Sequence, residues 1–220
     1  MNFPILSSLI ILPTVGALFL LFSKDKNSNT GKYVALFTSF VNFLISIYLW
    51  YLFDPSTSDF QFVEDRKWLV EFVNYKIGID GISILFIILT TLITPLCIIS
   101  VNNTIKIRLR DFLIAILVME SLLIGVFCSL DLVIFYLFFE AGLIPMFLII
   151  GIWGGARRVY SALKFFLYTL LGSVLMLVAI ISIYWIAGTT DIIKLYSLGV
   201  DEKYQNLLWL AFFSSFAVKT

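Results

Sequence analysis

Long runs of residues without charge constrain this chain more than any other feature of its sequence. A helix needs about 20 apolar residues to cross a hydrocarbon core of about 30 Å. Four runs carry no charge, and two more are interrupted once, by Glu120 or Glu140: 1–23, 33–53, 81–105, 165–190, 112–130 and 132–156. A last run, 204–218, stops at Lys219. The sequence predicts an all-α, polytopic integral membrane protein with six full transmembrane helices and a truncated seventh, because the strands of a barrel would be shorter and alternating.

The composition supports this prediction and argues against other classes of protein. Hydrophobic residues make up 61% of the chain and charged residues 13%, whereas a soluble domain is about 25% charged. A net charge of +1 gives no reason to expect a nucleic acid partner. The chain has no histidine, and its two cysteines, Cys97 and Cys128, each lie alone inside an apolar run. We expect a packing role for both cysteines, and we expect no cofactor or metal in this chain.

The connections between the apolar runs predict how the chain is oriented in the membrane. Alternate connections carry nine basic residues against two acids: Lys24, Lys26, Lys32, Lys106, Arg108, Arg110, Arg157, Arg158 and Lys164, with Asp25 and Asp111. Acids dominate the other connections, of which residues 54–80 are the longest. The positive-inside rule places the basic side in the cytoplasm or matrix and the N-terminus outside. The first run has no basic residues before it and no cleavage site, so it predicts a retained helix, bent at Pro13.

Three ionisable side chains lie inside predicted spans, where a charge costs about 2.5–3.5 kcal/mol: Glu120, Glu140 and Lys219. Glu120 lies ten residues before position 130 and Glu140 ten residues after it. At about 1.5 Å per residue, both carboxyl groups reach the middle of the bilayer on two helices of a tight hairpin. Desolvation and mutual repulsion favour the neutral carboxyl group, which makes both glutamates candidates for holding and releasing protons. In the alternative interpretation, both are protonated acids that only hydrogen-bond neighbouring helices.

Three further residues are candidates for a role near these charges. Pro145 cannot donate to the carbonyl of Ala141, so the helix should kink beside Glu140 and free a carbonyl for water or a neighbouring group. Asp131 is either the N-cap of the following helix or an acid at the mouth of an aqueous path. Lys164 either extends to the membrane interface or takes part in a buried proton relay.

Lys219 stands one residue before the end of the sequence. Residues 206–220 make about 22 Å of helix, which is less than a bilayer core. We therefore expect the sequence to be truncated and Lys219 to be buried in protein that follows. A lysine in such a place can exchange protons with a carboxylate partner.

The motif that identifies a family lies in residues 130–173, LDLVIFYLFFEAGLIPMFLIIGIWGGARRVYSALKFFLYTLLGS. This segment resembles subunit M of the proton-pumping NADH:quinone oxidoreductase, respiratory complex I, which is called subunit 4 in mitochondria. Three other pieces agree with that family in order: GIDGIS at 78–83, MES and IGVF within 119–127, and FAVK at 216–219. The resemblance covers essentially the whole chain but only about half of the family's antiporter-like subunit.

The resemblance implies roles for single residues. Glu140 matches the family's essential glutamate and Lys219 its lysine at a helix break, an ion pair whose making and breaking drives proton transfer. Glu120 and Lys164 match further residues of the proton path, and Asp131 matches the acid of the LDL turn. Residues 1–130 would then form the first four helices, with an extramembrane loop near 54–80. Residues 131–220 would begin the proton-translocating module.

Three interpretations of function follow. In the first, the chain is a proton-translocating membrane subunit of NADH:quinone oxidoreductase in the bacterial inner membrane or the mitochondrial inner membrane. Its partners would be neighbouring membrane-arm subunits, and NADH, flavin, iron–sulfur clusters and quinone would be bound in partner subunits. The second is a subunit of a multisubunit sodium/proton antiporter. The third is a seven-helix receptor or an assembly scaffold whose buried charges are structural.

Overall fold

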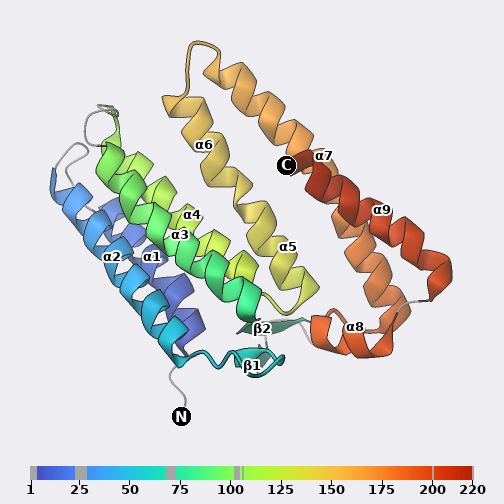
Figure 1. The fold of residues 1–220 in the computed structure, drawn as a ribbon. Coiled ribbons are helices and arrows are strands. Elements are labelled where there is room, and N and C mark those ends of the chain that lie inside the picture. The colour runs from blue at the N-terminus through green and yellow to red at the C-terminus, as the bar shows by residue number, and fades with distance from the viewer. Residues whose placement is uncertain are drawn as a thin grey trace. The chain divides into compact units, whose positions relative to one another are not determined.

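The computed structural model describes residues 4–22, 29–67, 73–101, 105, 107–199 and 201–219. Nine helices and two strands are seen in this part of the chain (Figure 1): α1 (Ile5–Phe22), α2 (Asn29–Leu52), β1 (Gln61–Lys67), β2 (Asn74–Ile79), α3 (Gly81–Ser100), α4 (Leu109–Cys128), α5 (Leu132–Ala141), α6 (Leu143–Trp153), α7 (Arg158–Ala187), α8 (Ile192–Leu198) and α9 (Glu202–Lys219).

Six helical segments of the described chain are long and apolar enough to cross a membrane: Ile5–Phe22, Thr30–Leu52, Gly81–Ser100, Leu109–Cys128, Leu132–Trp153 and Arg158–Ala187. They coincide with the six long uncharged or once-interrupted runs of the sequence, so the prediction of six membrane helices is confirmed. The fifth of them consists of α5 and α6 together. α9 carries charges at Glu202, Lys203 and Lys219 and is not among the six.

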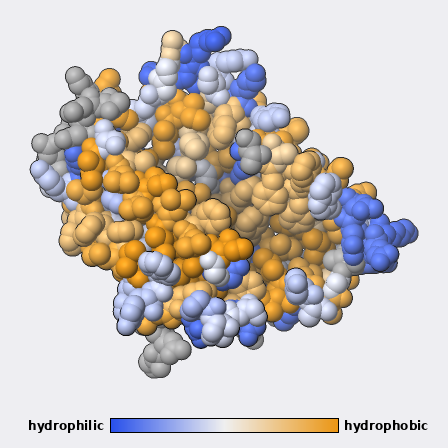
Figure 2. All heavy atoms as spheres, viewed as in Figure 1, coloured by the Kyte–Doolittle hydropathy of each residue, from blue (hydrophilic) through white to orange (hydrophobic). Residues whose placement is uncertain are grey.

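The helices expose apolar side chains and bury polar ones. Trp185 and Tyr51 are 86% and 85% exposed, and Figure 2 shows hydrophobic residues covering much of the visible surface. Ser39, Asn42 and Thr91 are fully buried. This distribution suits helices surrounded by lipid, where small polar residues hydrogen-bond between helices and apolar residues face outward.

The chain divides into two compact units, and residues 1–64 and 77–128 form the first, which contains α1 to α4. Hydroxyl groups join its helices: Thr14 to Ser121 at 2.8 Å, and Ser46 to Thr91 at 2.7 Å. An apolar cluster around Leu20, Ala35, Leu113 and Leu117 completes this interior. α1 stays helical across Pro13, the position where the sequence predicts a bend.

Acidic side chains cap the N-termini of two helices of this unit. Asp80 accepts hydrogen bonds from the backbone N–H groups of Ile82 and Ser83 at the start of α3, at 3.2 and 2.7 Å. Partial burial raises the pKa of Asp80, but the hydrogen bonds from Ser83 and Ile82 outweigh it and lower that pKa below its usual range. Glu64 accepts from the N–H of Leu6 at 3.0 Å and so caps α1 from a distant part of the chain.

The segment 54–80 differs from the expected loop, because β1 and β2 pair within it as a two-stranded sheet. β2 is partly buried over its first three residues and fully buried over its last three, Ile77, Gly78 and Ile79. Part of the orientation argument falls on Lys24, Asp25, Lys26 and Lys106, which lie outside the described residues.

The second unit contains residues 65–76 and 129–220, and with them α5 to α9. α9 packs along α7, where Ala179, Ile183 and Leu208 form a buried cluster. α7 ends at Gly188, whose φ of 71° is the left-handed conformation that favours glycine at a helix C-terminus. Each unit is described separately, so the predicted closeness of Glu120, in the first, and Glu140, in the second, stays a prediction.

Candidate functional site

A break in the fifth membrane helix lies beside Glu140. α5 ends at Ala141, α6 begins at Leu143, and Gly142 forms the joint between them. Pro145 follows three residues later and has no N–H to continue the hydrogen-bond ladder. The kink that the sequence predicts from Pro145 stays a prediction, since the interruption lies at Gly142, whose φ of −60° and ψ of −22° are still those of an α-helix.

Lys219 contacts the backbone at this break. Its ammonium Nζ donates to the carbonyl oxygen of Phe139, the residue before Glu140, at 3.1 Å. From the sequence we expect a free carbonyl at Ala141. The carbonyl that accepts the hydrogen bond from Lys219 of α9 is instead that of Phe139. The same ammonium lies 3.1 Å from the centroid of the Phe139 ring, and Phe135 and Phe216 pack around that ring. Carbonyl and ring face both stabilise a cation.

Glu140 and Lys219 interact electrostatically without a direct bond. The charge of Glu140 acts on the Lys219 ammonium, but no ion pair joins these two described residues. The Oε2 atom of Glu140 is buried and has no hydrogen-bond partner in the described part of the chain. The direct ion pair that the family resemblance implies is therefore not formed here. A lysine held on a carbonyl and a ring, near an uncommitted carboxyl oxygen, is suited to exchanging a proton with that oxygen.

The packing of α9 on α7 holds Lys219 in this position. A methyl group added at Gly172 of α7 would lie 3.0 Å from Cβ of Val218, the residue next to Lys219. The lack of a side chain at Gly172 thus lets the last turn of α9 approach α7 closely. Gly172 was not recognisable from the sequence, because its neighbour Val218 lies far along the chain.

Glu120 lies in the interior of the first unit, only 1% exposed. Asn42 of α2 is fully buried and donates from Nδ2 to Oε1 of Glu120 at 2.9 Å. The sequence predicts the buried acid but not its partner. The available signal is a polar stripe, Ser39, Asn42 and Ser46, at spacings of three and four residues on one face of an otherwise apolar helix.

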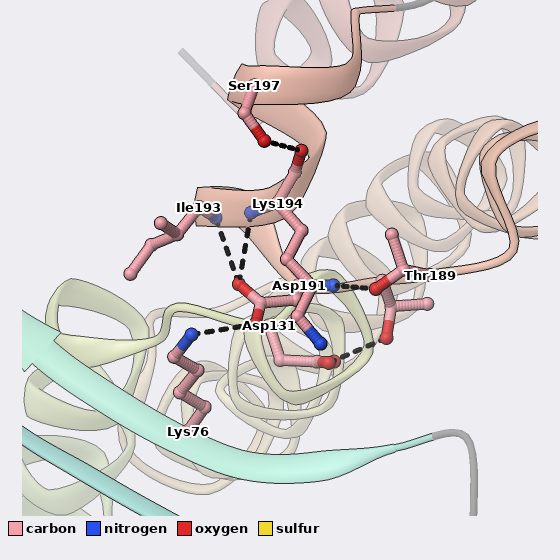
Figure 3. A network of polar contacts seen from close by, with 8 residues as sticks. Lys76, Asp131, Thr189, Asp191, Ile193, Lys194 and Ser197 are labelled. Carbon is pink, nitrogen blue, oxygen red and sulfur yellow. Dashed lines mark hydrogen bonds and ion pairs between the residues drawn. The ribbon is translucent and has the colours of Figure 1, made fainter.

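Asp131 has the geometry of an N-cap, and it also joins separate parts of the second unit. Its Oδ1 accepts from the N–H of Val133 at 2.9 Å, and its Oδ2 accepts from the Thr190 hydroxyl at 2.6 Å. Next to it, Asp191 caps α8 and pairs with Lys76 at 2.7 Å (Figure 3). The backbones of Asp131 and Asp191 form an isolated antiparallel bridge. This network was not predicted from the sequence, because it joins three parts of the chain that are 55 residues or more apart.

Lys164 lies on the exposed face of α7 between Tyr160 and Tyr168, one turn away on each side. Within the described residues it forms no hydrogen bond or ion pair. Cys97 is exposed, Cys128 is buried, and both are free thiols. No group of three or more metal-ligating side chains occurs among the residues that were described.

Comparisons with known proteins find similar chains. A family model described as NADH:quinone oxidoreductase/Mrp antiporter, TM, matches residues 129–220. NADH-quinone oxidoreductase subunit M of Rhodobacter capsulatus is 54% identical over 208 residues, which cover 89% of this chain and 40% of that protein. NADH-ubiquinone oxidoreductase chain 4 of Marchantia polymorpha is 48% identical, over 97% of this chain and 44% of that protein. The chain thus spans less than half the length of these curated relatives.

Solved structures share the fold. A chain of respiratory complex I from Thermus thermophilus with bound NADH superposes with a TM-score of 0.82 at 29% identity, over 97% of this chain and 44% of that one. A chain of the Mrp complex from Dietzia sp. DQ12-45-1b superposes with a TM-score of 0.81 at 14% identity, over 98% of this chain and 24% of that one. At 14% identity the second likeness concerns the fold alone.

Proposed function

Because this chain belongs to the family of transmembrane subunits shared by NADH:quinone oxidoreductase and Mrp antiporters, we propose that it is part of a proton-translocating membrane subunit of NADH:quinone oxidoreductase. The observation that carries this proposal is the contact of Lys219 with the helix break beside Glu140. The names of its relatives at 54% and 48% identity support the choice of complex.

The proposed step is a proton exchange controlled by Glu140. While Glu140 is ionised, its charge stabilises the Lys219 ammonium near the Phe139 carbonyl. When the charge of Glu140 is neutralised, the ammonium loses that stabilisation and releases its proton to the next acceptor along the path. Glu120 and Lys164 would extend this path. Redox chemistry in other subunits would set the charge of Glu140, and protons would enter from the inner side and leave outside.

The NADH, flavin, iron–sulfur clusters and quinone of this reaction belong, in the proposal, to partner subunits. The partners of the chain would be the neighbouring antiporter-like subunits of the membrane arm. Two bounds define the proposed domains: residues 1–130 hold the first four helices, and 131–220 begin the translocating module. α9 would be the start of a seventh membrane helix, and the N-terminus would lie outside. The membrane would be a bacterial inner membrane or a mitochondrial inner membrane.

A subunit of a multisubunit sodium/proton antiporter is the alternative with the same fold. The Mrp structure supports this alternative only at the level of fold, because its chain is 14% identical to this one. A protein named as an oxidoreductase subunit is 54% identical, which favours the first proposal. The two proposals differ in energy source. Proton movement driven by NADH oxidation favours the first, and sodium-dependent proton exchange without NADH favours the second.

Replacing Glu140 with glutamine in the full-length protein tests the proposal. We expect NADH oxidation by an artificial acceptor to stay intact while quinone-linked proton pumping falls, because glutamine removes the charge that acts on Lys219. Glu202→Gln, at an exposed position in the first turn of α9, is the matched control and should pump normally. Unchanged pumping in Glu140→Gln would contradict the proposal.

A further inference from the structure

The pair formed by Asn42 and Glu120 contains two oxygen atoms without partners. One hydrogen bond joins the side chains, from Nδ2 of Asn42 to Oε1 of Glu120. The remaining oxygens, Oδ1 of Asn42 and Oε2 of Glu120, are both buried and have no partner among the described residues. Buried polar atoms are nearly always hydrogen-bonded, so two such atoms on one bonded pair need an explanation.

A single hydrogen atom can satisfy both oxygens. An ionised glutamate has only acceptors, and the amide oxygen of asparagine is also an acceptor, so two unpaired acceptors would remain in the interior. A protonated carboxyl group has one O–H donor. If the proton sits on Oε2, it can be donated to Oδ1, while Nδ2 keeps its bond to Oε1. Amide and acid would then each donate once and accept once.

Among the described residues that line the crevice beside the pair, no free hydroxyl group supplies the missing hydrogen. A crevice of about 250 Å³ beside Glu120 is lined mostly by apolar side chains of α3 and α4. Its two threonines, Thr90 and Thr94, donate their hydroxyl hydrogens to carbonyls of their own helix, at 2.8 and 3.0 Å. A buried water needs two to four polar partners, and the lining of this crevice offers few.

No charged group faces the pair from the packed helices. α1 and α3 contain no charged residue, and Cys97 in the crevice is the titratable group of α3. α2 has Lys32 in its first turns, ten residues from Asn42, with Tyr33, Tyr48 and Tyr51 on its exposed side. α4 has Arg110 and Asp111 at its start, nine residues or more from Glu120. Among the described residues of these four helices, an ionised Glu120 would therefore have no counter-charge.

We infer that Asn42 is a positioning residue that holds the proton of Glu120, in a cyclic amide–acid pair between α2 and α4. The pair orients the carboxyl group and fixes its proton on Oε2 until a proton acceptor competes with the amide. The evidence for the pair is the set of contacts of Asn42 and Glu120 within the first unit. Its use as a proton store for translocation rests on the proposed function.

Infrared spectroscopy of the native membrane complex, containing the full-length chain, tests this inference. A protonated carboxyl group has a C=O stretching band separate from carboxylate bands, and hydrogen bonding lowers its frequency. We expect such a band at neutral pH that is lost in Glu120→Gln. In Asn42→Leu the band should persist and shift to higher frequency, because the Nδ2–H donor to Oε1 is gone. The control is Ser46→Ala, on the same helix as Asn42, which removes a buried hydroxyl bonded to Thr91 of α3 and should leave the band in place.

Two results would overturn the inference. The first is a carboxylate band, instead of a protonated carboxyl band, that disappears in Glu120→Gln; this would mean an ionised acid bridged by water. The second is an unshifted band in Asn42→Leu. If Asn42→Leu does not assemble, Asn42→Ala removes the same N–H donor with a smaller side chain and should also move the band. Since the readout is a carboxyl vibration, a negative result leaves the pumping test on Glu140 unaffected.

Discussion

The role of Asp131 could be narrowed to two alternatives from the sequence but not decided. The sequence allows an N-cap or an acid on an aqueous path. In the structure both carboxylate oxygens are committed, one to the backbone of α5 and the other to Thr190, and the carboxyl group is buried. The cap was predictable because aspartate before an apolar run is a helix-start signal. The bond to Thr190 was not, because it depends on how α7 and α8 fold back.

We predict that Asp131→Ala destabilises the protein by about 2 kcal/mol, from the loss of the cap and of one buried hydrogen bond. Asp131→Asn retains one side-chain oxygen for the α5 backbone and should lose about half as much. Thermal unfolding of the detergent-solubilised complex measures both changes. Asp59→Ala, at an exposed position, is the control. Equal stability of wild type and Asp131→Ala would mean that the cap does not contribute to the stability of the protein.

The elements themselves were mostly predictable, because uncharged runs of membrane length leave helices as the only solution. The two strands were missed because a strand depends on its partner, and the segment between them reads as an interfacial loop. The contact of α9 with α7 was also beyond sequence reasoning, since Gly172 and Val218 are 46 positions apart. Yet this contact brings Lys219 to the break between α5 and α6.

We predict that Gly172→Ala lowers the thermal stability of the protein, by about 1–3 kcal/mol, because the added methyl group would lie 3.0 to 3.2 Å from three atoms of Val218, closer than an ordinary contact. Gly151→Ala is the control, since its added methyl group would meet Ala162 at an ordinary 3.5 Å. A second substitution, Val218→Ala, removes the two γ-carbons that would lie 3.1 and 3.2 Å from the added methyl group, and should restore part of the loss in Gly172→Ala. Independent, additive effects of the two substitutions would argue against this contact.

At the scale of the whole molecule, the protein places apolar residues outside and small polar residues inside, and this arrangement makes its few interior charges informative. Glu120 and Glu140 were recognisable in the sequence because acids are costly inside apolar runs. Their immediate partners were not, because Asn42 and the Phe139 carbonyl come together with them only through helix packing. The chain spans less than half the length of its relatives, so its activity is tested in the full-length protein.

We propose above all that Lys219 carries a translocated proton. The most direct measurement is the number of protons moved per NADH oxidised in membranes that contain the full-length protein with Lys219→Met. The account predicts a lower ratio, with NADH oxidation by an artificial acceptor unchanged and with a normal ratio in the exposed control Lys203→Met. An unchanged ratio in Lys219→Met would contradict the account.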